Sequence, residues 1–285
     1  MASWHSYPTV AARGPTVLSQ LEIQQHDAKR LAAGYKKSFR LVEILAILTF
    51  WGLMVAAAVK AFPFHSSHTW VIASGLFAGF LFADFVSGFV HWMADTWGSA
   101  DMPYLGKSLV RPFREHHVDQ KAMTHHDYIE TNGANCLVSL PVAAGVLFIP
   151  LEPSSQWMSF ALFMFVMIAS MVYFVMWTNQ IHKWSHLEAE ETPKILKLMQ
   201  RLHLILPPGH HQLHHKSPYK TYYCITTGWL NWPLAKIGFY RHAERLITWG
   251  FGLIPRRDDL GIKAALQLAP LVLAEQQPAA ATQPL

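Results

Sequence analysis

Residues 157–177 read WMSFALFMFVMIASMVYFVMW, a run of 21 residues without one charged side chain. A helix needs roughly 20 apolar residues to cross the hydrocarbon core of a bilayer, so this run predicts a membrane-spanning helix. Residues 41–59 and 70–94 are two further apolar segments of sufficient length. Residues 136–151 are short for a span, but only Glu152–Gln156 separate them from the quoted run. The two segments therefore predict a helical hairpin, and the chain as a whole predicts four spans.

The composition of the 285-residue chain supports this interpretation. Hydrophobic residues make up 52% and charged residues only 14%, against about 25% charged residues in an average soluble domain. These values exclude a disordered chain and argue against a soluble globule. No segment alternates as the strands of a membrane barrel do, and a helix satisfies its own backbone in lipid. We expect an all-α integral membrane protein with about four transmembrane helices and a cytoplasmic, histidine-rich helical region.

Basic residues indicate how the chain is oriented. Four spans place both termini on one side of the membrane, and lysine and arginine cluster between residues 29 and 40 and in the loop after the second span. The positive-inside rule marks that side as cytoplasmic. We expect a basic N-terminal arm over 1–40, a membrane domain with the histidine boxes over 41–250, and a flexible tail over 251–285. The net charge of +5 suits anionic lipid as well as nucleic acid, but with these spans we expect membrane lipids and no nucleic acid as partners.

Histidine is the residue type that points to chemistry. The chain has 17 histidines, and 13 of them follow residue 90, on the predicted cytoplasmic side or at its membrane boundary. Residues four positions apart lie on one face of a helix, about 5–6 Å apart, so such a pair can offer two ligands to one metal ion. The pairs with this spacing are His182/His186, His210/His214, His211/His215 and His91/Asp95. The Asp95 carboxylate could either bind an ion or orient the imidazole beside it.

The histidines outnumber the ligands that one ion needs. A tetrahedral ion takes four ligands, whereas these boxes supply about ten imidazoles, which predicts a two-metal centre with positions left for water or oxygen. The two cysteines form no C-x-x-C pair, so neither a thiolate metal site nor a disulfide framework is expected. Imidazole ligands suit iron, zinc, copper or nickel and do not select among them. A basic, pH-sensitive surface is the alternative explanation of the boxes.

The second apolar segment also contains polar and small residues. A carboxylate at Asp84 would be costly in contact with lipid, so we expect it to face the interior of the bundle or a wet cavity. Gly75, Gly79 and Gly88 lie in the same segment. Small residues at such spacing predict close packing against a neighbouring helix.

Six motifs carry a resemblance to a known family. They are ADFVSGFVHWMADTWGS (83–99), RPFREHHVD (111–119), HDYIETNGANCL (126–137), TNQIHKWSH (178–186), HHQLHHKSP (210–218) and YCITTGWLNWPLAKIGF (223–239). Together they resemble the plasmanylethanolamine desaturases, within the histidine-box membrane di-iron desaturases, over more than half of the chain. The resemblance implies an O2-dependent enzyme that removes two hydrogens from C1′ and C2′ of the sn-1 alkyl chain of plasmanyl ethanolamine phospholipids. Its product is the vinyl ether of a plasmalogen.

The resemblance also implies cofactors and site residues. Two iron ions would be held by His91, His116, His117, His126, His182, His186, His203, His210, His211, His214 and His215. Asp95 would support these ligands, and Asn179 would bind through a water molecule, by analogy with acyl desaturases. His125 is left out because the family pattern does not require it. Electrons would come from cytochrome b5 and its reductase in the endoplasmic reticulum, or from a ferredoxin or similar carrier at a bacterial inner membrane.

Two other functions compete with this interpretation. The first is a di-iron desaturase or hydroxylase that acts on another lipid acyl chain, such as that of phosphatidylglycerol, and a lipid profile would distinguish it. The second is a non-enzymatic, metal-binding membrane signalling protein, which bound zinc without oxygen consumption would favour.

Overall fold

The computed structural model describes residues 39–97, 106, 110–216, 219–253 and 255. All regular structure in this part of the chain is helical, which confirms the expected all-α class. The long helices are α2 (Arg40–Ala61), α3 (Thr69–Thr96), α5 (Tyr128–Val146) and α6 (Met158–Ser185). The short helices are α4 (Arg111–Val118), α7 (Lys194–Arg201), α8 (Pro208–His211), α9 (Asn231–Lys236) and α10 (Phe239–Phe251). Nearly all of the predicted arm (1–40) and tail (251–285) lies outside the described residues.

Three helices are long and apolar enough to cross a membrane. They are Arg40–Phe64, which continues α2 through a 3-10 turn, together with α3 and α6. The first two contain the predicted segments 41–59 and 70–94, and α6 begins one residue after the start of the predicted segment 157–177. These three helices support a membrane protein. The fourth span and the cytoplasmic location of the histidine boxes stay predictions.

Helix α5 corresponds to the short predicted segment 136–151 but is displaced from it towards the N-terminus. It begins at Tyr128, eight residues before Cys136, because the Asp127 carboxylate caps its first turn. This carboxylate accepts hydrogen bonds from the N–H groups of Ile129 and Glu130, both at 3.0 Å. Helix α5 packs against α2 and against α6, so the predicted hairpin of the last two long helices is present.

Helices α3 and α6 approach each other closely along their length. A Cβ atom added to Gly79 would lie 2.3 Å from the carbonyl oxygen of Met167 on α6, so only glycine fits there. The Ser170 hydroxyl of α6 donates a hydrogen bond of 2.8 Å to the carbonyl oxygen of Leu76 on α3. In lipid the hydrophobic effect does not drive helices together, so close packing and interhelical hydrogen bonds stabilise the pair. Each such hydrogen bond contributes about 0.6 kcal/mol.

Large apolar side chains also face away from the bundle. Leu48, Val59, Phe77, Phe148 and Phe160 are all more than half exposed. Inside the bundle, by contrast, Phe50, Leu162, Phe165 and Met176 are buried. An exposed apolar surface around long helices suits lipid contact.

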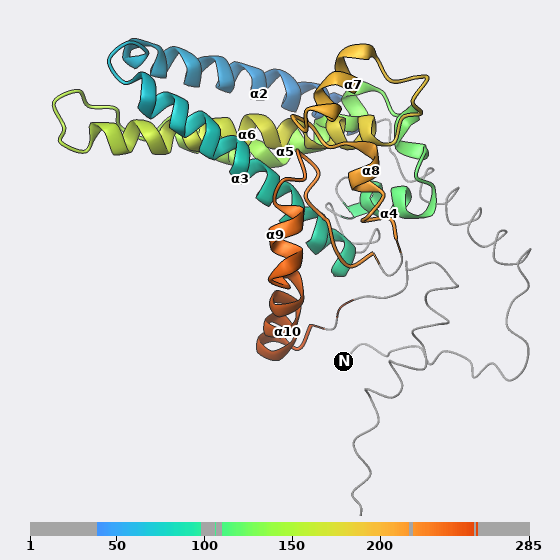
Figure 1. Ribbon diagram of the computed structural model, residues 1–285. Helices are drawn as coiled ribbons and strands as arrows, with labels where there is room; N and C mark the ends of the chain where they lie inside the picture. Colours follow the sequence, from blue (N-terminus) through green and yellow to red (C-terminus); the bar gives the residue numbers. More distant parts are fainter. Residues whose placement is uncertain (1–38, 98–105, 107–109, 217–218, 254, 256–285) are drawn as a thin grey trace, which may run out of the picture.

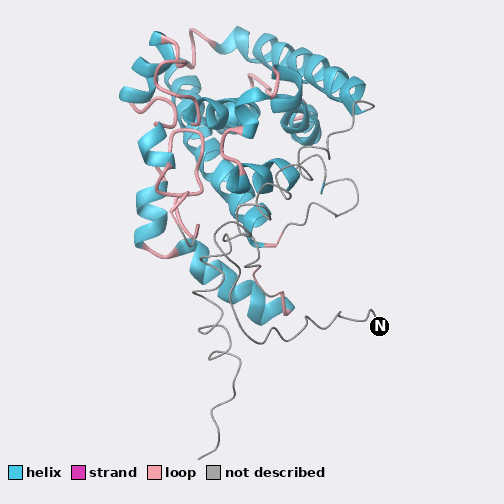
Figure 2. Ribbon diagram, turned by 90° about the vertical axis from the view of Figure 1, so that its right-hand side faces the viewer, coloured by secondary structure: helices cyan, strands magenta, loops and turns pink. Residues whose placement is uncertain are grey.

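The short helices gather at one end of the bundle. Helices α4, α7 and α8 lie where α2 begins and where α3 and α6 end (Figure 1). Helix α10 packs against α3, with 5.4 Å between the ring centroids of Tyr240 and Trp92. Figure 2 looks onto this end and shows the short helices and their connecting loops around the ends of the long ones. The polar, histidine-rich sequence is therefore concentrated at one end of the apolar helices.

Candidate metal centre

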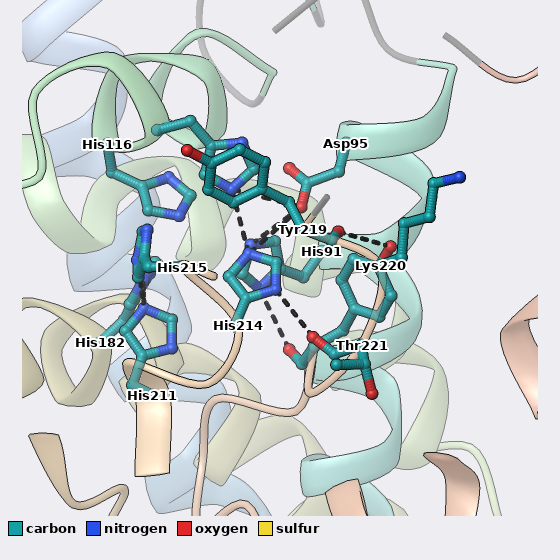
Figure 3. A network of polar contacts seen from close by, with 12 residues as sticks. His91, Asp95, His116, His182, His211, His214, His215, Tyr219, Lys220 and Thr221 are labelled. Carbon is teal, nitrogen blue, oxygen red and sulfur yellow. Dashed lines mark hydrogen bonds and ion pairs between the residues drawn. The ribbon is translucent and has the colours of Figure 1, made fainter. Parts of the chain in front are cut away.

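Eight of the predicted histidines converge at this end of the bundle, and Figure 3 labels six of them. They are His91 on α3, His116 and His117 on α4, His182 and His186 at the end of α6, and His211, His214 and His215 on α8 and the turn after it. All eight are buried. Helices α3 and α6 bring the His91 and His182 rings to 5.5 Å from each other, measured between ring centroids, and the other rings come from α4, the end of α6, α8 and the turn after α8.

One part of the cluster consists of imidazoles alone, and we call His182, His186, His211 and His215 the all-imidazole group. Their Nε2 atoms face one another. The Nε2–Nε2 distances are 2.8 Å for His182–His211, 3.2 Å for His182–His186, 3.0 Å for His186–His211 and 3.0 Å for His211–His215. Four ring nitrogens at such separations are aimed at one small volume.

The other part contains an acid, and we call His91, His117, His214 and Asp95 the carboxylate group. The Nε2 atoms of His117 and His214 are 3.0 Å apart. Asp95 Oδ2 lies 3.3 Å from Nε2 of His91 and 3.5 Å from Nε2 of both His117 and His214. His116 joins the two groups, because its ligand nitrogen lies within 4.8 Å of ligand atoms in both.

Backbone carbonyls orient three of these rings. Nδ1 of His91 donates to the carbonyl oxygen of Tyr223 at 3.0 Å, and Nδ1 of His214 donates to that of Thr221 at 3.0 Å. Nδ1 of His116 donates to the carbonyl oxygen of Pro112 at 3.3 Å. A carbonyl only accepts, so the proton of each neutral ring is on Nδ1 and the lone pair is on Nε2, which faces the cluster.

The donor atoms of the cluster fit a metal ion. Burial and neighbouring imidazoles lower the pKa of His116 and His211 well below the ordinary value, and burial lowers the pKa of His186 to about 4. These rings are neutral near pH 7. The Nδ1 contacts of His91 and His214 with backbone carbonyls leave Nε2 of both rings facing the Asp95 carboxylate. A bound cation would satisfy the nitrogens and the carboxylate together.

Asp84 anchors the segment that supplies two of the orienting carbonyls. This fully buried carboxylate on α3 accepts hydrogen bonds from four backbone N–H groups, so it faces the interior as expected. Its Oδ1 accepts from Thr226, Thr227 and Gly228 at 3.2, 2.8 and 2.9 Å, and its Oδ2 accepts from Leu230 at 3.1 Å. These hydrogen bonds fix the segment 221–231 to α3. Asp84 lies about two helical turns before His91 on that helix.

The roles of the Tyr223 and Thr221 carbonyls could not be predicted, because every residue type has the same backbone carbonyl. Asn231 was also missed. Its side chain accepts from the N–H of Cys224 at 2.8 Å and donates to the carbonyl of the same residue at 2.9 Å. The Asn231 side chain thus both accepts from and donates to the backbone of Cys224, which fixes the turn between the two residues. The residue type alone does not predict this role.

His126 lies outside the cluster, although it was predicted as a ligand. Its Nε2 is 3.6 Å from Glu130 Oε1 and 3.7 Å from Glu115 Oε2. The same two carboxylates pair with Arg111, at 3.3 and 2.8 Å. His126 therefore belongs to a separate charged network beside α4, and its role as a ligand stays a prediction.

His203 and His210 also lie outside the cluster. His203 is exposed, has a positive φ of 55° and accepts the indole N–H of Trp229 on its backbone oxygen at 2.8 Å. Nε2 of His210 accepts the side-chain amide of Asn231 at 3.2 Å. The His210 ring thus contacts Asn231, whereas the rings of His211, His214 and His215 contact other histidines of the cluster. Ligation by His203 and His210 stays a prediction.

Asn179 lies one helical turn below the cluster, at an apolar cavity. Its side-chain amide donates to the carbonyl of Thr131 and to Oδ1 of Asn135, both at 3.2 Å. The cavity measures about 300 Å³ and lies between α3, α5 and α6. Its apolar lining includes Val86, Val90, Phe113, Val138, Val142, Met171, Val172, Val175 and Ile225. Val90 precedes His91, and Phe113 packs against the His91 ring with 4.9 Å between ring centroids, so the cavity reaches the metal cluster.

Comparison with known proteins places the chain among lipid-modifying enzymes. Residues 80–258 match the model of the lipid desaturase domain. The plasmanylethanolamine desaturase of Myxococcus xanthus is 52% identical over 87% of this chain and 85% of its own, and plasmanylethanolamine desaturase 1 of Mus musculus is 43% identical over 83% and 88%. The chloroplastic fatty acid desaturase 4-like 1 of Arabidopsis thaliana is 27% identical over 66% and 61%. No solved structure matches the chain.

Proposed function

The chain belongs to the lipid desaturase family, and from this premise we propose that it is a plasmanylethanolamine desaturase. The reaction converts the 1-O-alkyl chain of a plasmanyl ethanolamine phospholipid into the 1′-2′ vinyl ether of a plasmalogen. One O2, two electrons and two protons are consumed, and two water molecules are released. The observation that carries the proposal is the buried cluster of eight histidines beside an apolar cavity.

The two groups of the cluster are the proposed ligands of two iron ions. His182, His186, His211 and His215 would hold one ion and His91, His117 and His214 the other, with His116 between them. Bound iron would supply the oxidation of an unactivated C–H bond by O2, which amino-acid side chains alone do not achieve. Asp95 would balance the charge of the ion nearest to it.

The apolar cavity would bind the alkyl chain. Valine and methionine side chains from three helices provide dispersion contacts and exclude water from the carbons to be oxidised. Phe113 and Val90 lie between this cavity and the His91 ring, so they would position the first carbons of the chain at the cluster. Asn179 lines this cavity, and its hydrogen bonds to Thr131 and Asn135 fix the orientation of its side chain.

The depth of the cluster suits the substrate. C1′ and C2′ adjoin the glycerol ether oxygen, close to the head-group level of a bilayer. The cluster lies at the ends of the apolar helices rather than at their middle. We further propose four spans, with α5 as the fourth, and a cytoplasmic cluster at a bacterial inner membrane or the endoplasmic reticulum. Electrons would come from cytochrome b5 or a ferredoxin-like carrier.

Mass spectrometry of ether phospholipids tests this function. The chain, His186→Ala and His242→Ala would each be expressed in a host that lacks plasmalogens but supplies ether lipid and reductant. His242 is exposed and lies outside the cluster, so this variant is the matched control. We expect acid-labile lipids two hydrogens lighter than their precursors with the chain and the control, and none with His186→Ala.

Three other results would contradict the proposal. Absence of vinyl ether from all three hosts, with the protein present in the membrane, would remove the substrate assignment. A new double bond in a phospholipid acyl chain would favour the acyl desaturases instead. Bound zinc with no oxygen consumption would favour a non-enzymatic role.

A further inference from the structure

A polar cleft opens on the other side of the metal cluster from the apolar cavity. It measures about 700 Å³ and lies between the end of α6, α7 and the start of α8. Its lining includes His186, Glu188, Lys197, Arg201 and Lys121. His186 is also a member of the all-imidazole group, with its Nε2 atom 3.2 Å from that of His182. The cleft therefore shares a wall with the metal cluster.

One face of α6 joins the cavity, the cluster and the cleft in that order. Thr178 lines the apolar cavity, His182 belongs to the cluster and His186 lines the cleft. These residues are four positions apart, so they lie on one face of the helix and follow one another at about 6 Å intervals along its axis. A molecule that reaches from the cavity into the cleft must pass the metal cluster.

The charges in the cleft are of both signs. Lys197 and Arg201 are exposed and occupy successive turns of α7, so they present two cationic groups on one face. Glu188 supplies a carboxylate and pairs with Lys121. A guanidinium binds phosphate through two parallel hydrogen bonds, and a carboxylate binds an ammonium group. The cleft therefore offers partners for an anion and a cation within one volume.

We infer that this cleft is the binding site for the phosphoethanolamine head group of the lipid, an inference that rests on the proposed function. The oxidised carbons are separated from the phosphate only by the ether oxygen and the glycerol unit. When the alkyl chain occupies the apolar cavity and C1′ lies at the cluster, the head group must lie immediately beyond it. Arg201 and Lys197 bind the phosphate, and Glu188 binds the ammonium group.

Steady-state kinetics of the full-length enzyme in lipid vesicles test this assignment. The variants are Arg201→Ala and Lys197→Ala, with Lys194→Ala as the control, since Lys194 is an exposed cation of the same helix that does not line the cleft. For plasmanyl ethanolamine phospholipid we expect KM to rise about tenfold in the first two variants, the effect of one lost charge-assisted hydrogen bond. We expect kcat to change less than twofold and the control to match the parent chain.

Two further variants separate a positioning role from general damage. Arg201→Lys keeps the charge but loses the paired hydrogen bonds, so we expect it to recover part of the KM effect. Glu188→Gln removes the partner of the ammonium group. We expect it to lower the preference for ethanolamine over choline head groups, while the KM for the choline lipid stays unchanged.

Binding of soluble glycerophosphoethanolamine, measured by calorimetry on the purified full-length protein, separates this inference from the proposed function. Binding that Arg201→Ala abolishes supports the cleft even where the parent chain forms no vinyl ether, in which case only the reaction assignment fails. Vinyl ether formation with an unchanged lipid KM in both alanine variants overturns the cleft and leaves the function intact. A rise in KM for the electron-donor protein alone would assign the cleft to donor docking and would also overturn the inference.

Discussion

The two groups of the histidine cluster are held in different ways. In the carboxylate group, His91 and His214 donate through Nδ1 to backbone carbonyls, and Asp95 adds a negative charge. In the all-imidazole group, the buried Nδ1 atoms of His211 and His215 have no hydrogen-bond partner among the described residues. The protein therefore fixes the first group through its backbone, whereas the second is arranged mainly by contacts between its own rings. We expect the two metal positions to differ in affinity and in their dependence on pH.

Replacing a ring of the all-imidazole group should have the largest effect. His211→Ala removes a ring whose Nε2 contacts those of His182, His186 and His215. We expect loss of vinyl ether formation by at least about 100-fold, because one metal position loses a ligand at its centre. Iron content, measured by plasma mass spectrometry, should fall from two ions per chain towards one.

The adjacent residue provides the matched comparison. His210 contacts Asn231 rather than the cluster, so His210→Ala should keep both iron ions and lose only part of the activity. Equal loss of iron in His210→Ala and His211→Ala would show that His210 is a ligand, as the spacing of the histidine box predicts.

The spacing of the histidines predicted some of this arrangement and not the rest. His182/His186 and His211/His215 lie four residues apart and meet in the structure. His210/His214 have the same spacing, but the His210 ring contacts Asn231 whereas the His214 ring contacts His117. Spacing predicts which residues are close along the chain, whereas the residues that each ring meets across the fold decide which rings join the cluster.

The fold, like the histidine cluster, could be predicted only in part. Lipid requires long apolar helices, so the apolar runs of α2, α3 and α6 could be recognised from residue type alone. Helix α5 begins earlier than its apolar run because a capping carboxylate, Asp127, determines where it starts. Contacts such as those from Asp84 to residues 226–230 join segments that are more than 140 positions apart, and no local pattern predicts them.

Removing the negative charge of the carboxylate group should have the second largest effect. Asp95→Asn leaves the three imidazoles in place but removes the carboxylate 3.3–3.5 Å from their Nε2 atoms. We expect iron affinity at this position to fall about 10- to 100-fold, with the all-imidazole position unaffected. Chelator titration of the loaded protein should then show one weakened ion rather than two. Simultaneous release of both ions would contradict the separation into two groups.

A smaller effect should come from the anchor of the carboxylate group. Asp84→Asn replaces a carboxylate that accepts four backbone hydrogen bonds by an amide with a single acceptor oxygen. We expect stability to fall by about 1.5–3 kcal/mol, the value of a hydrogen bond to a charged group, and activity to fall several-fold as the Tyr223 and Thr221 carbonyls shift. Thermal unfolding and the lipid assay would measure the two losses. Asp119→Asn alters an exposed carboxylate and is the control.

The dependence of the metal-free protein on pH should be the smallest effect, and it should come from the all-imidazole group. Burial lowers the pKa of His186 from 6.5 to about 4, and that of His211 is also lowered. Below about pH 6.5 the unfolded chain binds protons that the folded chain does not, so stability falls as the pH decreases and levels off near the folded pKa. Without metal, we expect the unfolding temperature to drop by a few degrees between pH 7 and about pH 5. His186→Gln should reduce this slope, whereas His242→Gln, at an exposed position, should not. An unchanged slope in His186→Gln would show that the pH dependence arises outside the all-imidazole group.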